Sequence, residues 1–339
     1  MTELLRVARA AQAAFAAGES AILATVIRVG GSTYRRPGAR MLLTEAGWVA
    51  GSISGGCLET DVLQKAWWRT ENGSTRVVYD STQEDEDIEW GFGLGCNGVV
   101  EVLLERLTET TVAHLARLER WQTERTVGVL ATTGEGKRLA LEHNGQFWGE
   151  ESLLAGAQEV LTNCQSFWRD ETFYEYIVPS QRLVIFGAGH DVMPLAKIAT
   201  ELLGWQVIVV DSRSLTLHPE RFPGASVVQS FPIHTLEPTD AVVLMTHSFS
   251  ADQELLPLVL QSSVGYLGLL GPRRRTERLL ETLPPSDGGQ GVGRIHAPLG
   301  LDIGADNPEE IALALVAEIR AWSAGRSGGP LTLREGPIH

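Results

Sequence analysis

The chain has few cysteines and no long apolar run. Its three cysteines, Cys57, Cys96 and Cys164, are odd in number and form no Cys-x-x-Cys pair. This excludes a disulfide scaffold and a zinc ribbon, and it is typical of a protein of the reducing cytoplasm. No stretch approaches the roughly 18 consecutive apolar residues of a membrane span. Residues 1–20 contain an Ala-rich stretch broken by Gln12, so we expect a packed first helix there and not a signal peptide.

Basic residues are also in the minority. Lys and Arg number 28 against 42 Asp and Glu, which makes the formal net charge -14 at pH 7. A general nucleic-acid binder shows a basic face, and an anionic membrane attracts basic segments, so the charge argues against both partners. One basic loop, at residues 34–40, is either a solvated turn or a recognition site for an anionic ligand or partner. The length of 339 residues suggests two domains.

The second half of the chain carries a nucleotide-binding pattern. A predicted strand at 183–186 leads into Gly187 and Gly189, a helical pattern follows, and a second apolar strand ends on Asp211. Glycine allows a tight turn and a close approach of the backbone to a ligand, and the N-terminus of the next helix attracts a phosphate. An acidic residue at the end of the second strand can bind ribose hydroxyls. Val192 holds the third glycine position, which predicts looser packing of helix against strand.

Strands and helices alternate throughout this half. The predicted strands are 183–186, 207–210, 227–229, 241–246 and 266–270, and a closing helix is predicted at 308–322 with Asn307 as its N-cap. This alternation is typical of a doubly wound parallel sheet in an α/β protein. We therefore expect an α+β domain at 1–178, a Rossmann-like domain at 181–323 and a glycine-rich tail at 324–339.

Polar residues end these predicted strands, where ligands bind in open α/β sheets. They include His190, His247 and the run Arg273, Arg274 and Arg275. The arginine run opens a helix, at an end that disfavours cations, so an anion such as a phosphate between the helix and the guanidinium groups would explain it. A solvated surface turn is the alternative. The histidines are interpreted as hydrogen-bonded surface or cleft residues; a metal site is a second interpretation, and His190 could contact a bound phosphate.

Two cysteines lie beside glycines, Cys57 in SGGC and Cys96 in GLGCNG. Flanking glycines leave a sulfur approachable, and mobile loops around a thiol suit the handling of a sulfur or of a soft metal centre. Cys57 is expected in the first turn of a helix, where the dipole favours thiolate, although Glu59 and Asp61 oppose that effect. The alternative for both thiols is a structural role, which is the only interpretation for Cys164.

Several long motifs together resemble the XdhC/CoxI family, the accessory proteins that mature xanthine dehydrogenase and related molybdenum hydroxylases. The matching stretches include SISGGCLE, WGFGLGCNGVVEV, VIFGAGHD, VVDSR and YLGLLGPRRRTERLL. The resemblance implies that the protein binds molybdenum cofactor (molybdopterin), helps a cysteine desulfurase to provide the terminal sulfido ligand, and delivers the cofactor to the apo-hydroxylase. The family's GLGCGG-like loop is implicated in holding the cofactor, and its cysteine falls on Cys96. The cysteine of the family's SGGCxE motif falls on Cys57, and Asn97 replaces a common glycine.

These observations predict a cytoplasmic carrier and chaperone for molybdenum cofactor, and not a turnover enzyme. The predicted cofactor-binding residues are Cys96, Cys57, Gly187, Gly189, His190, Asp211, His247, Arg273 and Arg274, with Cys96 as an indirect contact to molybdenum. We expect the cysteine loops of the first domain to face the anion site of the second across a cleft. The expected partners are a xanthine dehydrogenase-type hydroxylase and a cysteine desulfurase, and a homodimer is expected from the family.

Two other classes of function stay open. An NAD(P)-dependent oxidoreductase would use the Rossmann-like domain for its nucleotide, with Asp211 favouring NAD, but the sequence suggests no His–acid pair in that domain. A structural scaffold would dock a hydroxylase without contacting its cofactor, and the glycine-flanked cysteines and the arginine run would then be incidental.

Overall fold

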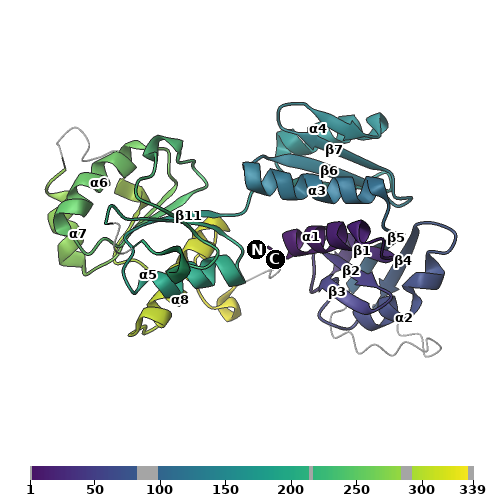
Figure 1. Cartoon of the computed structure of the whole chain (residues 1–339), viewed down its shortest axis with the longest axis horizontal. Helices are drawn as coiled ribbons and strands as arrows, with labels where there is room; N and C mark the ends of the chain where they lie inside the picture. Colours follow the sequence, from purple (N-terminus) through teal and green to yellow (C-terminus); the bar gives the residue numbers. More distant parts are fainter. Residues whose placement is uncertain (1, 82–97, 214–216, 284–291, 335–339) are drawn as a thin grey trace. The chain divides into compact units, whose positions relative to one another are not determined.

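The computed structural model describes residues 2–81, 98–213, 217–283 and 292–334, and its fold belongs to the predicted α/β class (Figure 1). The chain divides into two compact units, Glu3–Pro179 and Ser180 to the C-terminal end. None of the described helices is both long and apolar enough to cross a membrane.

The first unit contains two five-stranded antiparallel sheets. One has the strand order β3-β2-β1-β5-β4, with the bounds β1 Ala21–Gly31, β2 Arg40–Thr44, β3 Gly47–Gly51, β4 Thr75–Asp80 and β5 Gly98–Arg106. Alternate residues of β1 face opposite sides because side chains alternate along a strand. Leu23 packs with α1 (Glu3–Ala16) on one side, and Ile22 packs with α2 (Glu59–Arg69) on the other. Cys57, predicted in the first turn of a helix, lies instead in the turn just before α2.

The other sheet has the order β8-β7-β6-β10-β9. Its strands are β6 Gly128–Thr133, β7 Arg138–Glu142, β8 Phe147–Gly149, β9 Phe167–Arg169 and β10 Thr172–Ile177. Helix α3 (Glu109–Glu124) packs beside α1, while α4 (Leu154–Asn163), which follows a 3-10 turn at Glu151–Leu153, covers this sheet (Figure 1). The fully buried Trp121 of α3 donates from Nε1 to Glu142 Oε1 at 2.9 Å, so a large side chain of the core also has its polar group satisfied.

The second unit is built on one parallel sheet with the strand order β13-β12-β11-β14-β15-β16. Its strands are β11 Arg182–Phe186, β12 Gln206–Val210, β13 Ser226–Val228, β14 Ala241–Leu244, β15 Tyr266–Leu269 and β16 Ile295–His296. From β11 the strands are added outward to β13 on one side, and from β14 they are added outward to β16 on the other side. This change of side between β11 and β14 is the Rossmann arrangement. The prediction of a Rossmann-like sheet is confirmed. The short β16 was missed because two residues carry no periodic signal.

Helices cover both faces of this sheet. They are α5 Val192–Lys197, continued by a π-helical turn at Ile198–Leu202, α6 Phe249–Gln261, α7 Arg273–Leu280 and α8 Pro308–Ser323. Leu183 and Ile185 of β11 face the core shared with α5 and α8, and Val184 and Phe186 face the core shared with α6 and α7. Short 3-10 turns lie at Pro219–Arg221, Ile233–Thr235, Val292–Arg294 and Leu331–Leu333.

Candidate functional site

The carboxyl edge of the parallel sheet brings together the residues predicted in the second half of the chain. Phe186 pairs with Val210 on one side and with Leu244 on the other, and Leu244 pairs with Leu269. The segments that follow β12, β11, β14 and β15 are therefore neighbours in that order. They carry Gly187, Gly189, His190, Asp211, His247, Arg273 and Arg274.

Close packing explains the first glycine of the loop after β11. Gly187 has φ +120°, and a Cβ there would stand 2.2 Å from the Met245 carbonyl oxygen. A Cβ on Gly189 would stand 2.5 Å from Asp191 Oδ1. Val192 at the third glycine position is fully buried in the core of the sheet. Gly187 is thus required by a neighbouring backbone atom, independently of any ligand, whereas a Cβ on Gly189 would meet only the end of the Asp191 side chain.

Replacing Gly187 by alanine is expected to lower the free energy of unfolding by about 2–3 kcal/mol, because φ +120° is strained for an L-residue and the Met245 carbonyl cannot move freely. Thermal unfolding followed by circular dichroism measures the loss. Gly293→Ala is the control, since a Cβ there meets no described atom within 4 Å. Equal melting temperatures for the two variants would contradict the steric argument.

Asp211, expected to bind ribose hydroxyls, forms hydrogen bonds with neighbouring protein groups. Asp211 Oδ2 accepts a hydrogen bond from Ala188 N at 3.0 Å, and the Arg213 guanidinium donates from Nε to Oδ1 at 2.9 Å and from an amino group to Oδ2 at 2.7 Å. The Asp211 side chain is 5% exposed. Hydrogen bonds from Arg213 keep the pKa of Asp211 below its usual value, although burial opposes them. Its carboxylate is thus bound within the second unit.

This ion pair predicts a pH effect on stability. Because the pKa of Asp211 is lower in the folded than in the unfolded chain, its contribution is present above about pH 4 and is lost as the pH falls through the folded value. The contribution is at most about 1 kcal/mol because Arg213 is more than half exposed. Thermal melting at pH 7 and pH 3 should show a smaller acid-induced loss for Asp211→Asn than for the wild type. An equal loss would contradict the assignment.

A His–acid pair, which was not predicted from the sequence, lies at the same edge. His247 Nε2 is 2.9 Å from Asp191 Oδ2, and His247 takes a left-handed backbone conformation with φ 56°. The pair joins the loops after β11 and β14, and the His247 side chain remains 60% exposed. Nothing in local sequence signals it, because the two residues meet only through the order of the strands. His190 is exposed, and a further histidine, His296 in β16, pairs with Glu318 at 2.8 Å.

The arginine run divides into two parts. Arg275 donates to the buried Asp252 Oδ2 at 2.6 Å, and Asp252 also accepts from Thr246 Oγ1 at 2.5 Å. This network ties the start of α7 to the loop after β14. Arg273 and Arg274 are exposed, and no ion pair joins them to another described residue. Arg275 is therefore structural, while its two neighbours are free to meet an anion.

In the first unit, Cys57 lines a narrow pocket. The pocket is bounded by side chains of the basic loop, by the turn before α2 and by β4 and β5, including Ser32, Tyr34, Arg35, Ser54, Tyr79, Ser81 and Gly98. Ser81 N donates to Gly98 O at 3.0 Å, and Gly98 N donates to Ser81 Oγ at 2.9 Å. Cys96 lies outside the described residues. It precedes Gly98 by two positions, so the segment that contains Cys96 begins and ends at residues of this pocket.

Glu59 organises the turn that presents Cys57. Its carboxylate accepts from Ile53 N at 3.0 Å, from Ser54 N at 2.8 Å and from Gly56 N at 3.1 Å, and Ser54 Oγ also donates to it. Cys57 Sγ in turn donates to Ser54 Oγ at 3.4 Å. Glu59 is only 2% exposed, so its charge is satisfied by the turn. This role was missed, since the sequence shows an acid near a helix start but not its inward direction.

Tyr79 lines another side of the pocket, and its hydroxyl is hydrogen-bonded to the buried Asp61. Tyr79 Oη donates to Asp61 Oδ2 at 2.6 Å, and Arg69 donates to the same oxygen at 2.6 Å. Burial would raise the pKa of Asp61, but these hydrogen bonds and one from Lys65 outweigh it and lower the pKa. Burial also raises the pKa of Tyr79, which stays a neutral donor. Asp61 thus anchors α2 to β4, and its charge is engaged by these partners.

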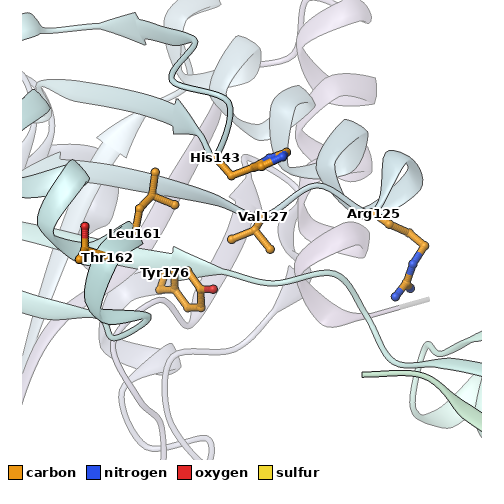
Figure 2. A pocket seen from close by; sticks show the side chains of 6 residues that line it. All are labelled: Arg125, Val127, His143, Leu161, Thr162 and Tyr176. Carbon is orange, nitrogen blue, oxygen red and sulfur yellow. The ribbon is translucent and has the colours of Figure 1, made fainter. Parts of the chain in front are cut away.

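A separate cavity of about 430 Å³ lies at the end of the second antiparallel sheet. Figure 2 shows the six residues that line it, Arg125, Val127, His143, Leu161, Thr162 and Tyr176. Burial, aided by a hydrogen bond with the Cys164 thiol, raises the pKa of Tyr176 to about 12. Cys164 itself is exposed at the end of α4. No group of three or more potential metal ligands occurs among the described residues.

Comparisons with known proteins agree with this division of the chain. The family model for the XdhC Rossmann domain matches residues 183–319, and the model for the XdhC and CoxI family matches residues 14–80. A protein of Bacillus subtilis (strain 168), described as a probable subunit of xanthine dehydrogenase, is 37% identical over 315 residues, which are 89% of this chain and 92% of that protein.

Two further similarities extend over most of the chain. The molybdenum cofactor insertion chaperone PaoD of Escherichia coli (strain K12) is 25% identical over 315 residues, covering 92% of this chain and 86% of PaoD. A crystal structure from Bacillus halodurans, described as a xanthine dehydrogenase, matches with a TM-score of 0.79 and 31% identity, covering 98% of this chain and 99% of that one.

Proposed function

Since this chain belongs to the XdhC and CoxI family, we propose that it is an accessory protein that binds molybdenum cofactor and delivers it to a xanthine dehydrogenase-type hydroxylase. The names of its relatives support this role, because one is a cofactor insertion chaperone and another is described as part of a xanthine dehydrogenase.

The pocket of Cys57 is the observation that carries the proposal. The molybdenum of the cofactor is bound by dithiolene sulfurs, and a thiol is the side chain that suits such a sulfur-ligated centre. Cys57 is partly accessible, and the turn that presents it is held by the buried Glu59. The thiol therefore suits the metal centre of the group. In the proposal, Cys57 and Cys96 hold the cofactor, which supplies the redox-active metal centre once it is in the hydroxylase.

The exposed Arg273 and Arg274 are the proposed anion site of the second unit. A phosphate there would be bound by two guanidinium groups that have no ion pair with another described residue. His247 stands at the end of the neighbouring strand, where its Nε2 contacts Asp191. The supply of sulfur by a cysteine desulfurase, a cytoplasmic location and a homodimeric state complete the proposal. The desulfurase and the homodimer come from the family resemblance alone, and the cytoplasmic location comes from the few cysteines.

Purification of the full chain from cells that make molybdenum cofactor tests the proposal. We expect molybdenum and pterin to copurify in a near-constant ratio, measured by mass spectrometry of the metal and by fluorescence of the oxidised pterin. The loaded protein should restore activity to a cofactor-free hydroxylase. Binding to the hydroxylase with no pterin above background would instead favour a scaffold, and copurified nicotinamide would favour an oxidoreductase.

A further inference from the structure

The basic loop at residues 34–40 forms one wall of the pocket that contains Cys57. Tyr34 and Arg35 of this loop line the pocket. The Arg35 guanidinium is 2.5 Å from Glu3 Oε1, so its charge is paired within the protein. What the loop presents to a ligand at this wall is therefore the aromatic ring of Tyr34.

The Tyr34 ring rests on the turn that presents Cys57 and has its other face open. A Cβ on Gly55 would stand 3.6, 3.7 and 3.8 Å from the ring atoms Cγ, Cδ1 and Cδ2, so Gly55 lies over one face of the ring. Tyr34 is nevertheless 68% exposed. An aromatic ring that is supported on one face and exposed on the other offers a surface on which a flat ring can stack.

Hydrogen bonds on both sides of Tyr34 hold this part of the loop in place. Thr33 Oγ1 donates to Arg35 O at 3.0 Å, which closes a turn around Tyr34. Glu3 Oε1 accepts from Arg35 and also, at 3.0 Å, from Ser52 N, so it ties the loop to the segment that leads to the Cys57 turn. Because the loop is ordered before a ligand arrives, binding costs little conformational freedom.

The interior of the pocket is too small for a pterin. Its volume is about 30 Å³, whereas a single water needs roughly 10–15 Å³ by the same measure. The interior beside Cys57 therefore has room for one or two small atoms. A pterin bound at this pocket must lie at its rim, where the open face of Tyr34 stands.

We propose that Tyr34 is a binding residue for the pterin, which stacks its flat ring on the open face, while Cys57 contacts the metal end of the same molecule. The inference rests on the proposed function, since it takes molybdenum cofactor as the ligand of this pocket. It adds a second contact that recognises the ring system and not the metal. The basic loop then belongs to the ligand site through its aromatic residue.

Equilibrium dialysis of the cofactor with the purified full chain tests the stacking. Tyr34→Leu removes the aromatic face and keeps an apolar side chain, and it is expected to raise the dissociation constant roughly tenfold. Tyr34→Phe keeps the ring and should bind as the wild type does. Phe15→Leu is the matched control, because Phe15 of α1 is an exposed aromatic residue outside the pocket lining. A melting curve verifies that each variant is folded.

A metal-free pterin separates the ring contact from the thiol contact. Neopterin, followed by its fluorescence in the same dialysis, should bind more weakly to Tyr34→Leu than to the wild type. Cys57→Ala should leave neopterin binding unchanged, although it weakens the binding of the complete cofactor.

The outcomes distinguish this inference from the proposed function. Cofactor binding that is equal in Tyr34→Leu and Phe15→Leu would overturn the stacking and leave the carrier role intact. Equal binding together with impaired transfer to the hydroxylase would likewise overturn it, and would assign Tyr34 to a protein contact. A wild type that binds no cofactor would overturn the proposed function, and neopterin binding that is absent or insensitive to Tyr34→Leu would overturn the stacking.

Discussion

Replacement of Cys57 by alanine is expected to weaken the binding of molybdenum cofactor by roughly tenfold to a hundredfold, or about 1.4–2.8 kcal/mol. The thiol is the soft donor of the pocket, and alanine supplies none. The turn itself should survive, because Glu59 holds it through Ser54 and three backbone N–H groups without using the sulfur. The measurement is the pterin and molybdenum content after purification, with a melting curve to verify folding.

Cys164→Ala is the matched control for this experiment. Cys164 is an exposed thiol at the end of α4, far along the chain from the pocket residues and absent from the pocket lining. Its replacement should leave cofactor content unchanged. Cys96→Ala is expected to reduce binding as Cys57→Ala does. If the Cys57 variant retains as much cofactor as the Cys164 variant, the thiol has no part in binding and the pocket loses its proposed role.

Removal of Asp240 should have the largest effect on stability, a loss of about 3–5 kcal/mol from the second unit. Asp240 is fully buried just before β14, and its carboxylate accepts from Arg182 at the start of β11 and from Glu237 N at 2.7 Å. Asp240→Ala would leave the buried guanidinium without its counter-charge. Because the chain has two units, hydrogen exchange of the amides in β11 and β14 measures the loss better than a single melting temperature.

An exposed ion pair provides the comparison. Glu159 and Arg169 are 2.8 Å apart with side chains 45% and 46% exposed, and Glu159→Ala should have only a small effect on stability because water screens the pair. Replacing both Arg182 and Asp240 by apolar residues of similar size should recover most of the loss of the single variant. A single variant as mild as Glu159→Ala would show that the buried pair does not stabilise the sheet.

The predicted strands of the parallel sheet show that local sequence patterns can predict the positions of strands and helices. The strands predicted at 183–186 and 207–210 are found at Arg182–Phe186 and Gln206–Val210, and the helix predicted at 308–322 is Pro308–Ser323. Asn307 caps that helix by accepting from Glu310 N at 2.9 Å. Apolar runs, glycine turns and capping residues act over a few neighbouring positions, so they can be recognised in the sequence.

The contacts of the candidate residues could not be predicted from local sequence patterns, because they depend on how the chain folds. The sequence predicted Asp211 at the end of a strand. Its hydrogen bonds with Ala188 N and Arg213 follow from how the loop after β11 folds back. Glu59 was predicted to oppose a thiolate at Cys57, and it instead builds the turn that presents this thiol. The position of an acidic residue near a cysteine in the sequence does not show which groups its carboxylate oxygens contact.

The amino-acid order alone determined the fold class, the two glycine-flanked thiols and the polar strand ends, because each of these is a property of short segments. Only the tertiary structure decided that Asp191 pairs with His247 and that Arg275, unlike Arg273 and Arg274, is bound to a buried acid. Those contacts join segments that the sheet places side by side, and strand order arises from the packing of the whole core.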